Sequence, residues 1–148
     1  DLQLAIAIIG GDPARFAPFA HLYRNSMQEF GHTLKDISIH SPGYISDTDE
    51  QAMEEQWPNY EKMVGRIGRE RGWAPPTKEG FAQECMHGSQ YVGSPETVAK
   101  KIVHAIKSVG AQRFDFKYAN GPQSHSQLMK CLELYGTKVI PLVKEMLA

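Results

Sequence analysis

The chain has 148 residues, of which 41% are hydrophobic and 22% charged, and its formal net charge at pH 7 is −1. This length allows one domain of the α/β class, and the nearly balanced charge gives no electrostatic reason to expect a nucleic acid or a membrane surface as partner. No apolar run reaches the roughly 18 residues that cross a bilayer, and no signal peptide pattern is present, so we expect a cytoplasmic location.

The chain begins with an apolar segment, residues 4–9, that has no polar interruption. Such a run is typical of a strand buried on both faces in a parallel sheet, with neighbouring strands on either side. Asp12 before Pro13 predicts a helix start, Pro18 predicts a kink or a late beginning, and Gly31 predicts the helix end. The predicted core-facing stripe of this helix is Phe16, Phe19, Ala20, Tyr23, Met27 and Phe30.

A second strand is predicted over residues 37–41, and the pair at 42–43, proline then glycine, is expected to end it. Asp47 with Glu50 three residues later fits a capping box and predicts the start of a long helix that Gly72 closes. The apolar stripe of this helix consists of Met53, Trp57, Tyr60, Val64 and Ile67.

Residues 73–92 have weak periodicity and several prolines and glycines, which predicts a long excursion of the kind that forms lids or binding loops. A short helix over residues 77–85 is the one regular element expected in it. The clearest helix signal of the chain follows, with Ser94 as N-cap, Pro95 in the first turn and Gly110 as the stop.

A third strand is predicted over residues 113–119, followed by a last helix around residues 128–143 whose far half Gly136 and Pro141 weaken. Alternating strands and helices favour right-handed crossovers and a parallel sheet. Because three parallel strands leave two exposed edges, we expect this sheet to be part of something larger, either cut from a longer chain or completed by another copy.

Alternation within the strands predicts one bulky apolar face and one small or polar face. Ser38 and His40 lie on the polar face of the second strand, and Asp115 and Lys117 lie on that of the third. A (βα)8 barrel has such an outside and inside, and its catalytic groups lie at the carboxyl ends of its strands. The residues predicted at these ends are Ile9, Gly10, Gly11, His40, Ser41, Pro42, Gly43, Tyr44, Lys117, Asn120 and Gly121.

Each candidate at the strand ends has more than one interpretation. The glycines there either admit a ligand close to the backbone or are ordinary turn residues. His40 is a base, a donor to a ligand, or a core histidine hydrogen-bonded to a neighbour such as Asp115. Asp115 and Lys117 could neutralise each other on one strand face.

Other chemistry has weaker support. The segment 93–96 could hold a phosphate at a helix N-terminus, although plain capping explains it as well. Cys85 and His87 lack the further ligands of a zinc site, and His125 is first of all a helix start. Cys85 and Cys131 are too few for a disulfide framework, so we expect free thiols in a reducing compartment and no metal.

Four segments, in this order, resemble the C-terminal portion of luciferase-like flavin-dependent monooxygenases: LAIAIIGGDPARF, ISIHSPGYISDTDEQAMEE, YVGSPETVAKKI and RFDFKYANG. The resemblance covers nearly the whole chain, with residues 72–90 the least closely matched. It implies the sixth, seventh and eighth βα units of a (βα)8 TIM barrel, so the chain would be a fragment of that domain and the first five strands would be the missing neighbours.

For the parent protein the resemblance implies that reduced FMN, with O2, oxidises a small organic substrate and that no residue of this chain need act as nucleophile. F420-dependent hydride transfer is the alternative within the enzyme class. The implied cofactor-binding residues are Ile9, Gly10 and Gly11, and the expected substrate mouth consists of His40, Tyr44, Lys117 and Asn120.

Two hypotheses of different classes follow for the isolated chain. In the first it is an inactive part of a flavin monooxygenase, because three of eight units cannot enclose a flavin. In the second it is a half-barrel that works as a binding or assembly module. We also expect self-association, because the apolar first strand lacks a neighbour.

Overall fold

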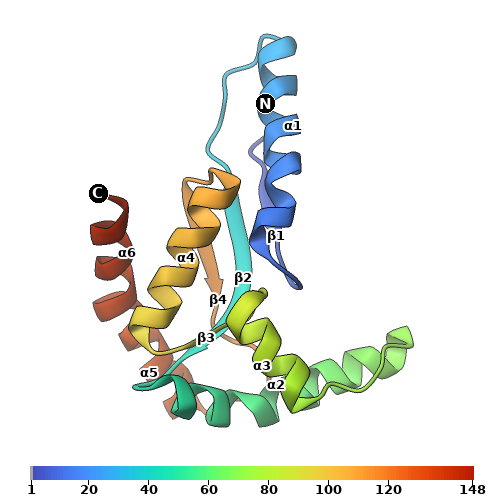
Figure 1. Ribbon diagram of the computed structural model, residues 1–148, viewed down its shortest axis with the longest axis vertical. Coiled ribbons are helices and arrows are strands. Elements are labelled where there is room, and N and C mark those ends of the chain that lie inside the picture. Colours follow the sequence, from blue (N-terminus) through green and yellow to red (C-terminus); the bar gives the residue numbers. More distant parts are fainter. Residues whose placement is uncertain (1) are drawn as a thin grey trace.

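A computed structural model describes residues 2–148 and shows a parallel sheet with helices packed on one face (Figure 1). The elements in chain order are β1 (Ala5–Ala7), a 3₁₀ turn (Pro13–Phe16), α1 (Ala17–Glu29), β2 (Ser38–Ile45), α2 (Asp49–Arg71), α3 (Lys78–His87), β3 (Tyr91–Gly93), α4 (Pro95–Val109), β4 (Arg113–Lys117), α5 (His125–Leu134), a π-helical turn (Tyr135–Val139) and α6 (Ile140–Leu147).

The strand β2 is the centre of the sheet and pairs in parallel with each of the other strands. Its residues 38–40 pair with β1 and its residues 38–42 pair with β4, whereas residues 43–45 pair with β3. Because β1 and β4 pair with the same residues of β2, they lie on its opposite sides, and β3 adds to the carboxyl end alone.

The predicted division of the sheet into two faces is confirmed in part, because Ser38, which was also expected on the polar face, is buried. Ile6 is in register with Ile39, and both are buried, as expected for the face that the helices cover. On the other face Ala7 is in register with His40, and both are exposed. His40 is also in register with Asp115 of β4, so the predicted polar groups share the face that the helices leave open.

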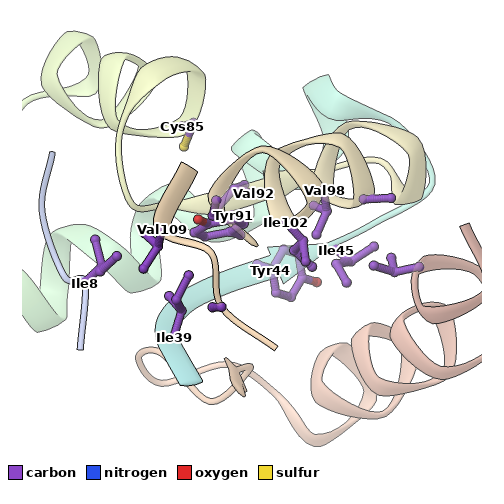
Figure 2. Close-up of a cluster of buried hydrophobic side chains, with 14 of the residues drawn as sticks. Ile8, Ile39, Tyr44, Ile45, Cys85, Tyr91, Val92, Val98, Ile102 and Val109 are labelled. Atoms are coloured by element: carbon purple, nitrogen blue, oxygen red, sulfur yellow. The ribbon is translucent and has the colours of Figure 1, made fainter. Parts of the chain in front are cut away.

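In Figure 1 the strands run downward, α1, α4 and α6 run upward beside them, and α2 crosses beneath the strand ends. The core lies between the sheet and α4. Figure 2 shows this cluster. Ile39 and Ile45 of β2, and Ile8 just after β1, are fully buried in it. From α4 the buried side chains are Val98, Ile102 and Val109. Within residues 2–148 no helix combines the length and apolarity that a membrane-spanning segment needs.

The prediction of three strands is wrong, because β3 forms within the expected excursion. The short strand pairs only with the end of β2, and Pro42 and Gly43 continue β2 instead of ending it. Pro42, which has no N–H to donate, lies after His40, the last residue of β2 that pairs with β1, and before Gly43, the first that pairs with β3. The expected short helix is present as α3, with Thr77 as its N-cap.

The first helix begins late, as Pro18 predicts: a 3₁₀ turn precedes α1, and the Asp12 side chain accepts a hydrogen bond from the backbone N–H of Ala14. The predicted stripe is partly wrong, because Phe19 and Phe30 are exposed. The helix α1 lies at the β1 edge of the sheet in Figure 1, and no helix or strand of residues 2–148 lies on its outer side.

Two helix boundaries differ from prediction. Thr48, and not Asp47, is the N-cap of α2, and Asp47 instead forms an ion pair with Lys130. The last helix is interrupted by the π-helical turn, which contains Gly136, and Pro141 stands in the first turn of α6. The helix α4 has the predicted caps, Ser94 and Gly110.

Candidate functional site at the carboxyl ends of the strands

The carboxyl ends of the parallel strands meet at the end of the molecule that α2 crosses (Figure 1). We call the region formed by residues 9–11, 40–46, 84–90 and 117–123 the strand-end site. Loops at this edge of a parallel sheet are where α/β proteins place ligands and catalytic groups.

The loop after β1 is open at its tip and anchored at its end. The Ile9 side chain is 70% exposed, and no heavy atom lies within 4 Å of the position that a Cβ of Gly10 would take. The backbone N–H of Gly11 donates to both carboxylate oxygens of Glu84, at 3.3 Å each. The three residues predicted to contact a cofactor therefore form a fixed loop with an uncovered surface.

Glu84 and Lys101 hold the segment before β3 in place. The Glu84 carboxylate also accepts hydrogen bonds from the backbone N–H of Ser89 at 3.0 Å and from its hydroxyl at 3.4 Å. Lys101 Nζ donates to the carbonyl oxygens of Cys85 at 2.5 Å and Gln90 at 2.7 Å. Burial lowers the pKa of Lys101 to about 8. One carboxylate and one ammonium thus join this segment to β1 and α4.

Asn120 belongs to a cluster of side-chain amides beneath the strand ends. Gln56 of α2 donates through Nε2 to the Asn120 carbonyl at 2.9 Å, and Gln123 donates through Nε2 to Gln56 Oε1 at 3.0 Å. The Asn120 side chain donates to Gln90 Oε1 at 3.5 Å, and the Asn120 backbone N–H donates to Gln123 Oε1 at 3.2 Å. These bonds join α2, the segment just before β3 and the loop after β4, so Asn120 is held in one position.

His40 and Lys117 lie on the open face of the sheet, where a hollow of about 260 Å³ is lined by His40, Asp115, Phe116, Lys117, Tyr118 and Ala119. The idea that His40 is a core histidine is wrong, because its side chain is exposed. The predicted pair of Asp115 with Lys117 is also wrong: Asp115 accepts a hydrogen bond from Arg113 Nε at 2.7 Å. Arg113 lies two residues before Asp115, on the same face of β4.

Tyr44 is placed at the strand end but does not face solvent. Its ring is buried, and its hydroxyl donates to Glu55 Oε2 at 2.7 Å. Burial and the bond to Glu55 raise the pKa of Tyr44 above its ordinary value. Burial alone would raise the pKa of Glu55, but the hydrogen bonds from Tyr44 and Gln51 lower it. Tyr44 therefore acts as a neutral donor that ties β2 to α2.

At two of the predicted glycines, the space that a side chain would take is occupied by neighbouring protein atoms and is not open to a ligand. A Cβ on Gly43 would lie 2.3 Å from the Phe116 ring and 2.4 Å from the carbonyl oxygen of Tyr91. Gly121 has a φ of +125°, and a Cβ there would lie 2.7 Å from the carbonyl oxygen of Asn59. Among the glycines of the strand ends, Gly10 is the one with open space beside it.

The remaining chemical candidates are structural. Burial raises the pKa of Cys85 to about 12 and that of Cys131 to about 11, so both free thiols stay protonated at neutral pH. His125 is the first residue of α5, and the Ser94 hydroxyl caps α4, as plain capping predicts. Among residues 2–148, no three His, Cys, Asp or Glu side chains are arranged to hold a metal ion.

Sequence reasoning missed three polar residues of the strand-end site, Glu84, Gln90 and Gln123, and a fourth, Gln56 of α2, that is hydrogen-bonded to it. Glu84 and Gln90 fall in the segment 73–92, whose weak periodicity did not predict which side chains face the interior. Gln56 did carry a signal, because it lies between the apolar positions Met53 and Tyr60 on the same predicted helix. A glutamine near such a stripe is expected to need a buried partner.

The geometry suits binding more than covalent chemistry. The site offers fixed amides, an exposed imidazole and an exposed ammonium around an uncovered glycine loop. Groups of this kind orient a ligand, and a bound cofactor can supply redox chemistry that no side chain here provides.

No protein-family model and no curated protein sequence matches this chain. Solved structures do match it in fold. One is the oxygenating constituent of 3,6-diketocamphane monooxygenase from Pseudomonas putida, a type II Baeyer-Villiger monooxygenase in complex with FMN. It has a TM-score of 0.67 at 18% identity, over 93% of this chain and 42% of that one.

Two further structures match over the same share of the chain. A monooxygenase from Streptomyces bottropensis has a TM-score of 0.69 at 14% identity, over 93% of this chain and 41% of its own. The coenzyme F420 dependent tetrahydromethanopterin reductase from Methanopyrus kandleri has a TM-score of 0.57 at 19% identity, over 93% of this chain and 44% of its own.

The chain spans 41% to 44% of the length of these three structures. The similarity predicted from the sequence is confirmed at the level of the fold, which is an α/β fold with a parallel sheet and covering helices. The chain thus shares its fold with part of the luciferase-like flavin monooxygenases.

Proposed function

We propose that this chain forms the last three βα units of a luciferase-like (βα)8 barrel, in an FMN-dependent monooxygenase that oxidises an organic substrate with O2. The observation that carries the proposal is the two-faced parallel sheet. Buried Ile6 and Ile39 lie under the helices, and exposed His40 and Lys117 lie on the open face, as on the outside and inside of a barrel.

In this proposal β1, β2 and β4 are the sixth, seventh and eighth barrel strands, and residues 1–148 are the C-terminal part of one domain. The strand β3 belongs to the excursion of the seventh unit, because it pairs only with the last residues of β2. The free sides of β1 and β4 would pair with strands from the rest of the barrel. The coverage of the matching structures, such as 42% of the diketocamphane enzyme, supports this extent.

The cofactor would contact Ile9, Gly10 and Gly11. The open space beside Gly10 fits the approach of a flat ring system, and the Glu84 carboxylate holds the loop from behind through Gly11. When bound, reduced FMN supplies the electrons that activate O2, while the residues of this chain orient the ring and exclude water. F420 with hydride transfer is the alternative, since the matching structures include an F420 dependent reductase.

The substrate mouth would be formed by His40, Lys117 and Asn120, with Tyr44 behind them. His40 and Lys117 present a donor and a positive charge to the hollow on the open face. Asn120 and Tyr44 are buried and hydrogen-bonded, so their role would be to hold the loop and β2 in position. A small organic substrate would then lie between these residues and the flavin.

By itself the chain would be inactive, because the first five barrel strands would carry the remaining wall of the flavin site. A half-barrel module that assembles with another chain is the second candidate, favoured by the exposed face of the sheet. The two candidates differ in whether a flavin belongs to the assembled site.

A flavin titration of the isolated chain, followed by absorbance, tests this assignment. We expect no stoichiometric FMN binding at micromolar concentrations, and riboflavin serves as the matched control without a phosphate. Tight FMN binding by this chain alone would contradict the view that most of the cofactor site lies elsewhere. If co-expression with the missing barrel half gives a folded barrel that binds no flavin, the result favours the half-barrel module over the monooxygenase.

A further inference from the structure

A second pocket, of about 550 Å³, lies beside the strand-end site between α2 and the loop after β4. It is lined by Lys62, Met63, Arg66, Arg69, Gly121 and Pro122. This set contains three cations and no carboxylate, in a chain whose net charge is −1. We call it the basic pocket.

The three cations share one face of α2, because their spacing of four and three residues returns each side chain to the same side of the helix. All three side chains are exposed. Within the described part of the chain, none of the three has a carboxylate partner within ion-pair distance. No carboxylate therefore pairs directly with these cations, and a bound anion would reduce their mutual repulsion.

The opposite wall of the pocket is rigid. Gly121 lies so close to α2 that a Cβ would meet the carbonyl oxygen of Asn59 at 2.7 Å. The residue before it, Asn120, accepts a hydrogen bond at its carbonyl from Gln56 of the same helix. The loop after β4 and α2 are thus joined about one turn before the cations. This contact fixes the distance between the two walls of the pocket.

We propose that the basic pocket binds an oxyanion group, a carboxylate, phosphate or sulfonate, of the organic substrate. The inference rests on the proposed function, which puts the substrate at the strand-end site, and Asn120 joins the two. Arginine side chains bind planar or tetrahedral oxyanions through two parallel N–H donors, and Lys62 adds a third positive charge. The oxyanion would anchor the substrate while its reactive part reaches the hollow at His40.

The test titrates the 148-residue chain with inorganic phosphate and with malonate at constant ionic strength, following backbone amide shifts by NMR. Saturable shifts at Gly121 and Met63 are expected. The double variant Arg66→Gln/Arg69→Gln should weaken this binding by at least about tenfold, since each lost charge removes a charge-assisted hydrogen bond. Circular dichroism checks that the variant keeps its helices.

Arg71→Gln is the matched control. Arg71 lies on the same helix but packs over the Trp73 ring, 5.3 Å from its centroid, and does not line the pocket. This variant should bind both anions as the original chain does. Shifts that do not saturate, or equal affinity in the double variant and the control, would overturn the proposal.

A competition experiment distinguishes the substrate from the cofactor as the source of the oxyanion. If FMN displaces phosphate from the basic pocket and riboflavin does not, the pocket takes the cofactor's phosphate and the substrate assignment fails. Because the anion titration needs no bound flavin, its failure is separate from that of the proposed function. If the assembled barrel binds malonate at the basic pocket but binds no flavin, the pocket proposal holds and the monooxygenase proposal fails.

Discussion

At the scale of single residues, Gly43 of β2 lies in close contact with residues of both β3 and β4. Its Cα is in register with Tyr91 of β3, and the Phe116 ring of β4 lies against it. A Cβ at this position would enter both neighbours, one of them a backbone carbonyl that cannot move aside. The absence of a side chain at Gly43 is therefore what allows Tyr91 and the Phe116 ring to pack this close to β2.

Gly43→Ala is expected to lower the free energy of unfolding by about 2–3 kcal/mol, because the added methyl group overpacks the junction of three strands. Urea unfolding followed by circular dichroism measures the change. Gly136→Ala is the control: nothing lies within 4 Å of its Cβ position, so that variant should stay within about 0.5 kcal/mol of the original. Equal stability of both variants would contradict the packing described for Gly43.

The positions of the candidate site residues along the chain could be predicted, but their exposure could not. Residues 9–11 and His40 follow from the strand ends, since the side-chain alternation of a strand is fixed by its backbone. Tyr44 and Asn120 were expected at a solvent-facing mouth and are buried. Their burial depends on α2, which crosses the strand ends, and no local pattern in the sequence encodes that crossing.

At the scale of elements, the start of α2 is joined to the start of α4 through one carboxylate. Asp49 accepts hydrogen bonds from the backbone N–H of Ser94 at 2.6 Å and from the hydroxyl of Thr97 at 2.9 Å. Burial alone would raise the pKa of Asp49, but these hydrogen bonds lower it. A charge at this helix N-terminus also interacts favourably with the helix dipole of α4.

Asp49→Asn should therefore destabilise the fold in a pH-dependent way. Because the folded-state pKa lies below the unfolded-state value, the carboxylate stabilises the fold above about pH 4, and this contribution is lost as the pH falls. We expect a loss of about 1 kcal/mol at pH 7 in urea unfolding, at the low end because the group is partly exposed, and a smaller loss near pH 3.

Asp47→Asn is the matched control for this experiment. Asp47 lies two residues earlier and pairs with Lys130 on the surface, so its replacement should change stability by less than about 0.5 kcal/mol at either pH. A pH-independent loss in Asp49→Asn would show that the hydrogen bonds to α4 do not depend on the charge.

Helices with strong caps were predictable, and the short strand β3 was not. Ser94, Pro95 and Gly110 define α4 by local chemistry that acts within one turn of each helix end. The strand β3 has only three residues, and its strand geometry comes from the hydrogen bonds that it makes with the end of β2. Such pairing is a tertiary effect, which overrides local preference in short segments.

At the scale of the whole molecule, the sheet has helices on one face and an open second face. Ala5 and Ala7 of β1 and Lys117 of β4 are exposed there, although parallel sheets are normally covered on both faces. The strands β1 and β4 also lie on opposite sides of β2, each with one side unpaired within the described residues. Both features favour contact with a further sheet or chain.

We therefore expect the isolated chain to self-associate, with a sedimentation coefficient that rises over the micromolar concentration range. Ala7→Lys places a charge on the open face beside the free edge of β1 and should shift the chain toward monomer, since lysine at an edge opposes strand pairing. Ala14→Lys, also exposed but in the 3₁₀ turn away from that face, should leave association unchanged. A cooperatively folded monomer at every concentration would mean that the open face is stable in water, and the case for a barrel completed by further strands would lose its physical basis.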